Sequence, residues 1–161
     1  MEGEIEMRRI LTSGLPILVF LAAGFAARGQ CVPGGLAVIV NTANPTESLS
    51  VSQLRKLILG DVRTWPDKKA VVLVSRETSS ELFKCVLSSI VRMSDAEYNR
   101  YIVGAEFRGA DPLAVKTVNS DAGAGKIVAS IPGSLMVVDA RDLPGFGASV
   151  RIVKVSALAG H

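Results

Sequence analysis

Four residues that follow an apolar segment carry the groups with which proteins hold oxyanions. Residues 71–74 (VVLV) are typical of a strand, and Arg76, Thr78, Ser79 and Ser80 come directly after it, where a helix is expected to start. A guanidinium forms paired hydrogen bonds with phosphate or carboxylate oxygens, and the free N–H groups of a helix start attract anions. These four residues are therefore the candidate ligand-binding residues.

The same segment also allows a purely structural interpretation. Arg76 can pair with Glu77 or Glu81, and the spacing from Thr78 to Glu81 predicts a capping box at the start of the helix. In that box the Glu81 carboxylate would occupy the third helical position, take up the N–H groups and repel a bound anion. Anion binding and helix capping both remain open at this point, and capping is the commoner use of such residues.

Residues that support catalysis or cofactor binding are scarce. The single histidine, His161, ends the sequence, and two cysteines are too few for a metal cluster. Residues 122–126 (AGAGK) lack the first glycine of a phosphate-binding loop, and Ile127 stands where Ser or Thr would coordinate magnesium, so a closely packed helix face is the better interpretation. The sequence therefore predicts neither an enzyme nor a cofactor.

The charge pattern does not favour a nucleic-acid partner. Eighteen Lys and Arg against 15 Asp and Glu give a net charge of +3. The basic residues are scattered, and no aromatic residues alternate with them to stack on bases. We therefore expect no nucleic acid among the partners.

The elements that must position the four residues alternate between apolar strands and amphipathic helices, which is typical of α/β proteins. Strands are predicted at 36–40, 71–74, 135–138 and 150–155, and helices are predicted to start at Ser50, Thr78, Ser94 and Ser120, with looser segments at 104–112 and 143–147. We expect an α/β fold with a mixed sheet of about five strands and helices on both faces.

The first thirty residues have the layout of a secretory signal. Arg8 and Arg9 precede an apolar stretch at 15–23, which is too short for a comfortable membrane span, and small residues follow it. We predict a signal peptide at 1–29, with Met7 as a possible true initiator, and a flexible N-terminus at 30–35. The cleaved product would be periplasmic or secreted and would have no stable membrane span. The alternative is that this segment stays uncleaved and anchors the protein. In an oxidising compartment Cys31 and Cys85 can pair, and the sequence leaves open whether they do.

The order of short motifs resembles that of phosphate ABC transporter substrate-binding proteins. The segments that carry the resemblance are LAVIVN at 36–41, Asn44-Pro45, Leu49-Ser50, Leu54-Arg55, Leu59-Gly60, Thr64-Trp65, VSR at 74–76, Met93-Ser94, Phe107 with Gly109, PGSL at 132–135 and VRIVKV at 150–155. The resemblance implies a type 2 periplasmic-binding-protein fold, in which two α/β lobes close on a ligand. By this resemblance, residues 36–158 correspond to little more than the second lobe.

The motif that would bind phosphate in this family is altered. Arg76, Glu77 and Ser79 match its Arg, acid and Ser, but both of its glycines are absent, and so are the first-lobe segments. The resemblance implies an exported solute-binding-protein-like domain that binds phosphate or another oxyanion through Arg76, Thr78, Ser79 and Ser80, with a homodimer as one way to complete the ligand shell. The alternative is a ligand-free module that binds another protein of the cell envelope through the surface where the first lobe would dock.

Overall fold

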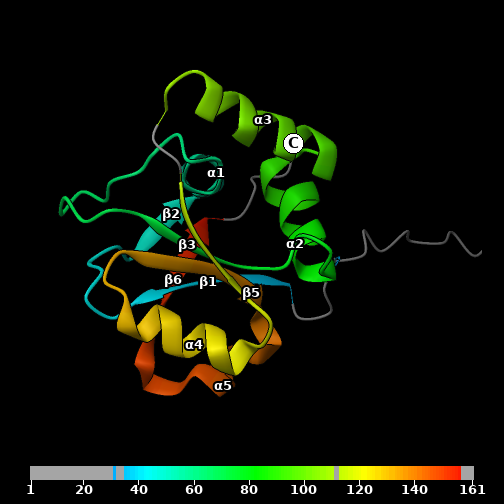
Figure 1. Cartoon of the computed structure of the whole chain (residues 1–161). Coiled ribbons are helices and arrows are strands. Elements are labelled where there is room, and N and C mark those ends of the chain that lie inside the picture. Colours follow the sequence, from blue (N-terminus) through cyan, green and yellow to red (C-terminus); the bar gives the residue numbers. More distant parts are fainter. Residues whose placement is uncertain (1–30, 32–34, 111–112, 157–161) are drawn as a thin grey trace, which may run out of the picture.

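A six-stranded mixed sheet forms the centre of the computed structural model, which describes Cys31 and residues 35–110 and 113–156 (Figure 1). The strand order is β2-β6-β1-β5-β3-β4. The strands are β1 (Leu36–Asn41), β2 (Ser48–Ser50), β3 (Val72–Arg76), β4 (Ala114–Val118), β5 (Ser134–Asp139) and β6 (Val150–Ser156). β1 runs antiparallel to β5 and β6, whereas β3 runs parallel to its neighbours β4 and β5. The carboxyl ends of β3, β4 and β5 therefore lie at one edge of the sheet.

Helices cover both faces of this sheet, as Figure 1 shows. One face carries α1 (Val51–Leu59), α2 (Glu81–Val86), the π-helical turn η1 (Leu87–Val91) and α3 (Asp95–Phe107). The other face carries α4 (Asp121–Ser130) and the short α5 (Leu143–Phe146), which the 3-10 turns η2 (Ala140–Asp142) and η3 (Gly147–Ser149) flank. Each face has its own apolar core, because alternate residues of β1, such as Val38 and Ile39, enter opposite cores. The predicted α/β fold with helices on both faces is confirmed.

Side-chain caps fix where two helices begin, as the sequence predicts. The Ser50 hydroxyl accepts a hydrogen bond from the Gln53 amide while the Gln53 side chain accepts one from the Ser50 amide. Ser94 and Glu97 form the same reciprocal pair at the start of α3. Each pair satisfies amide groups that the first helical turn leaves without partners.

The structure corrects four details of the sequence interpretation. The sheet has two further strands, β2 and β4, and the segment predicted as loose from residue 104 is helical up to Phe107. Residues 143–146 form α5 rather than a loop. The helix predicted to start at Thr78 starts after Ser80 instead, so Glu81 is its first residue and not the third residue of a capping box. β4 has four exposed residues out of five, so it lacks the apolar pattern by which strands are predicted.

A disulfide between Cys31 and Cys85 joins the N-terminal side of the domain to α2 across 54 residues of sequence. The sequence left this pairing open. Cys31 is exposed, whereas Cys85 belongs to the apolar core, so the bond attaches a surface segment to the interior. The proposed signal peptide lies outside the described residues. Among the helices that the structure describes, none is both long and apolar enough to cross a membrane.

Candidate anion-binding site

The four predicted residues lie where the carboxyl ends of β3 and β4 lie side by side, a place called the Arg76 edge below. Arg76 is the last residue of β3 and pairs in register with Val118, the last residue of β4. The chain continues from each strand into a helix, α2 after Ser80 and α4 after Ser120. Two helix starts therefore share one edge of the sheet with the Arg76 guanidinium, because parallel strands point their carboxyl ends the same way.

Arg76 is half-buried and paired with an acid that lies far away in the sequence. Its Nη1 donates a hydrogen bond of 3.1 Å to Oδ1 of Asp121, the first residue of α4. The Arg76 side chain is 25% exposed and that of Asp121 is 48% exposed. The pairing of Arg76 with Glu77 or Glu81, which the structural interpretation of the sequence allowed, does not form: the carboxylate next to the guanidinium comes from the other helix start.

The three hydroxyl residues divide into one that caps and two that face solvent. The Ser80 hydroxyl accepts a 3.2 Å hydrogen bond from the Phe83 amide and thereby caps α2. Thr78 and Ser79 are exposed, and within the described part of the chain neither side chain has a hydrogen-bond partner. Two exposed hydroxyls thus follow Arg76 in the chain by two and three residues, and the third is used to hold the helix start.

Glu81 is turned to solvent rather than toward the amides of the helix start. Its side chain is 84% exposed and accepts a 2.9 Å hydrogen bond from Lys84 one turn later. This contact with Glu81 raises the pKa of Lys84 above its ordinary value. The carboxylate that competes with an incoming anion is accordingly Asp121, which sequence reasoning did not connect with Arg76. No local signal could have made that connection, because it depends on the pairing of β3 with the unpredicted strand β4.

The glycine-rich start of α4 packs against a neighbouring helix, as predicted from residues 122–126. Ala124 and Gly125 are buried, and a Cβ atom added at Gly125 would lie 2.7 Å from Cδ1 of Phe146 in α5. This is too close for an ordinary carbon contact, so the absence of a side chain lets the two helices approach each other. The same part of the chain therefore has a packing role.

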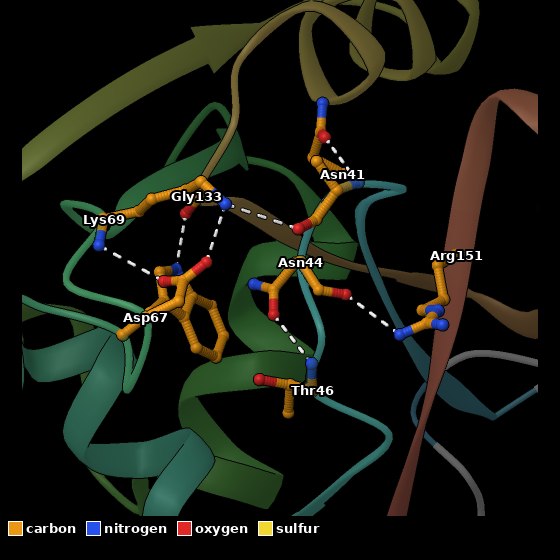
Figure 2. Close-up of polar contacts among 9 residues, drawn as sticks. Asn41, Asn44, Thr46, Asp67, Lys69, Gly133 and Arg151 are labelled. Carbon is orange, nitrogen blue, oxygen red and sulfur yellow. Dashed lines mark hydrogen bonds and ion pairs between the residues drawn. The ribbon is translucent and has the colours of Figure 1, made fainter.

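The opposite end of the sheet carries a second polar cluster that connects loops to the core (Figure 2). Nδ2 of Asn41 donates to the carbonyl oxygens at 128 and 129, at the end of α4, over 2.9 and 2.8 Å. Nη1 of Arg151 donates to the Asn44 carbonyl oxygen over 3.0 Å, and Nε1 of Trp65 donates to that of Gly133 over 2.7 Å. Several residues that carry the family resemblance therefore hold the fold together at a distance from the Arg76 edge.

No group of three or more acidic, histidine or cysteine side chains in the described residues is arranged to hold a metal ion. A guanidinium, two free hydroxyls and two helix starts can hold an anion at the Arg76 edge, and Asp121 opposes it.

Several solved structures have the same fold as this chain, and their descriptions include phosphate transport and phosphate binding. An ABC-type phosphate transport receptor from Vibrio cholerae is 22% identical with a TM-score of 0.58, over 75% of this chain and 46% of its own. PstS from Borrelia burgdorferi is 12% identical with a TM-score of 0.61, over 78% of this chain and 49% of its own. A Clostridium perfringens protein of the phosphate ABC transporter substrate-binding class, solved with bound phosphate, is 19% identical with a TM-score of 0.52, over 75% and 44%.

These similarities confirm the fold predicted from the motif order. The chain spans less than half the length of the structures that it matches, as expected of a single lobe. No protein-family model and no curated protein sequence matches the chain significantly.

Proposed function

We propose that this protein is an exported binding lobe that holds phosphate or a related oxyanion at Arg76, Thr78, Ser79 and Ser80. The observation that carries the proposal is the position of the Arg76 guanidinium at the edge shared by two helix starts. Thr78 and Ser79 are exposed beside it, and Ser80 orients the first turn of α2. The fold similarity to phosphate-binding proteins supports this choice of ligand class.

The proposed site is half of a ligand shell, so its affinity is weak by itself. The chain matches less than half the length of the solved phosphate transporter structures, and the groups at the Arg76 edge approach a ligand from one side. A second copy of this chain is one way to complete the shell. The role is binding rather than catalysis.

Export of the protein rests on the N-terminal sequence and on the disulfide. Cleavage after residue 29 would leave a mature chain that begins shortly before Cys31, whether translation starts at Met1 or at Met7. Disulfides persist in the periplasm and outside the cell, and the Cys31–Cys85 bond is consistent with such a compartment. Peptide mapping of the exported protein tests the cleavage: peptides from residues before 26 would contradict it.

Titration with inorganic phosphate and sulfate, followed by two-dimensional amide NMR, tests the binding site. We expect saturable shifts at the amides of 76–80 and 120–123, in the millimolar range, and their loss in Arg76→Gln. The Lys126→Glu variant is a control, because Lys126 is exposed on α4 beyond its first turn. Unchanged amide signals at tens of millimolar phosphate would contradict the proposal.

A second candidate function is a ligand-free module that binds an envelope protein. The observation that favours it is the group of exposed apolar side chains on α3 and β4, which includes Val103, Phe107 and Val115. Saturable anion binding is expected of the first function and not of the second, so the anion titration separates them.

A further inference from the structure

Among the described residues, β4 is an edge strand of the sheet whose outer side has no partner strand. It is the last strand in the sheet order, its pairing within the described part of the chain is with β3 alone, and its first four residues are exposed. The edge strand on the other side of the sheet is β2, which has three residues. An unpaired strand edge presents N–H and C=O groups that only another extended backbone can satisfy in series. Of the two edges, β4 offers the longer row.

A groove with an apolar lining runs between this edge and α3. Val115 of β4 and Val103 of α3 are about half exposed, and Phe107, at the end of α3, is 87% exposed. A cavity of about 250 Å³ between Val115 and Val103 reaches inward to the buried rings of Phe83 and Tyr98. Its lining is largely apolar, and it also includes Arg76, Thr78 and Glu106. A strand laid along β4 would thus have its backbone paired and an alternate side chain directed into an apolar cavity, which is the arrangement of peptide recognition by strand addition.

The positive charge of Lys116 on β4 indicates which residue type the added strand carries on the face directed away from the cavity. Lys116 lies between Val115 and Thr117, which line the cavity, so its side chain points to the opposite face of the sheet. It is exposed, and no ion pair forms to it within the described residues. An acidic residue on the added strand would complement it, whereas a lysine directly opposite would repel it.

The same charge disfavours a second copy of this chain as the occupant. Two β4 strands paired antiparallel and centred on Lys116 would place the two lysine side chains face to face, which natural sheet edges use to prevent self-pairing. A partner with an acid at that position gains the backbone hydrogen bonds without this repulsion.

We propose that the groove between β4 and α3 binds an extended segment of a partner protein, which adds to the sheet beside β4. The segment alternates apolar residues, one of which enters the cavity, with an acidic residue that faces Lys116. Arg76 and Thr78 belong both to this cavity and to the proposed oxyanion site, but the strand pairing depends on β4 and on Lys116 rather than on a bound anion, so either function can fail without the other.

Selection from a phage library of random ten-residue linear peptides tests the surface on the full mature chain with its disulfide intact. We expect enriched peptides in which apolar residues alternate with at least one Asp or Glu. In a fluorescence-polarisation assay with a synthetic enriched peptide, Val115→Lys should weaken binding at least tenfold. Lys116→Glu should reverse the preference, so that a peptide with lysine in place of the acid binds better, and Lys126→Glu should leave both affinities unchanged. Val115 and Lys116 are exposed, so both variants should keep the melting temperature of the parent, which is checked first.

N-methylation of alternate peptide amides tests the backbone pairing. One of the two alternating sets should abolish binding, because every second amide of an added strand faces β4, and the other set should be tolerated. No enrichment over the Val115→Lys variant, or equal tolerance of both methylation sets, would overturn the proposal. Concentration-dependent dimers that Val115→Lys dissolves would also overturn it, in favour of a second copy as the occupant.

Discussion

The ion pair between Arg76 and Asp121 leads to the most discriminating prediction about the proposed oxyanion site. An anion that binds the Arg76 guanidinium must share it with a carboxylate that already lies 3.1 Å away. Replacing Asp121 by Asn removes that charge and leaves a side chain of nearly the same shape. We therefore expect Asp121→Asn to bind phosphate more tightly than the parent protein does.

The size of the effect follows from the charges at the site. A phosphate dianion on the guanidinium would sit about 6 Å from the Asp121 carboxylate, and the repulsion there is about 1.4 kcal/mol even at the dielectric constant of water. Since Asp121 is 48% exposed, the water value is the appropriate lower bound. Such a difference corresponds to affinity about tenfold higher in the variant at low ionic strength, and to less as salt screens the charges.

The assay is the amide NMR titration with phosphate, performed on the parent, Asp121→Asn, Arg76→Gln and Glu81→Gln. Glu81→Gln is the matched control, because it removes one carboxylate that is exposed and paired with Lys84. Its affinity should change less than twofold. If Glu81→Gln tightened binding more than Asp121→Asn, the assignment of Asp121 as the competing carboxylate would be refuted. If Asp121→Asn and Arg76→Gln both left the affinity unchanged, the ligand would not bind at this edge.

Three predictions concern the fold. Replacing Cys31 and Cys85 by Ser should lower the free energy of unfolding by about 4 kcal/mol, the loop-closure value for a 54-residue separation, measured by urea denaturation. Gly133→Ala should cost about 2–5 kcal/mol in the same assay, because Gly133 has a φ of +87° and an added Cβ would lie 2.2 Å from the Ala70 carbonyl oxygen. Hydrogen bonds from the cap of α3 hold the pKa of Glu97 below its ordinary value of 4.5, so its contribution is complete above that pH and is lost as the pH falls through the lower folded value. Glu97→Gln keeps the capping geometry and should show a shallower loss of stability in acid.

Each of these three has an outcome that would count against it. A double Ser variant as stable as the parent would mean that the unfolded chain gains little freedom when the disulfide is removed. An alanine at Gly133 without cost would mean that the turn before β5 adjusts freely. An acid profile in Glu97→Gln identical to that of the parent would assign the acid sensitivity to other groups, such as Asp67, whose pKa is lowered by its hydrogen bond with Lys69.

Local patterns in the sequence were sufficient to predict the strands made of adjacent apolar residues and the helix starts with a side-chain cap. The apolar runs predicted β1, β3, β5 and β6, since buried strands need several adjacent apolar residues. The spacing of Ser50 with Gln53 and of Ser94 with Glu97 located two helix starts, because each cap involves residues three apart. The motif order also predicted a fold that the solved structures confirm.

The residues behind that resemblance and the residues of the proposed site have different roles. Asn41, Trp65 and Gly133 keep loops attached to the core, and these motifs are retained in the sequence. The segment after Arg76 departs from the family motif, and it is also the segment whose helix start was predicted two residues too early. The sequence therefore predicted the fold, whose motifs are present, better than it predicted ligand binding, whose motif is altered.

Tertiary structure alone decided which groups meet at the Arg76 edge. Arg76 and Asp121 are 45 residues apart, and β4, which brings them together, is an exposed strand held by its pairing with β3 rather than by an apolar pattern of its own. The Cys31–Cys85 bond and the groove beside α3 likewise depend on contacts between distant segments. The sequence by itself established the strands, the caps and the presence of an Arg with hydroxyls after a strand. The pairing of Arg76 with Asp121 and the position of β4 as an edge strand are properties of the assembled sheet, because strand order is set by packing across the whole chain.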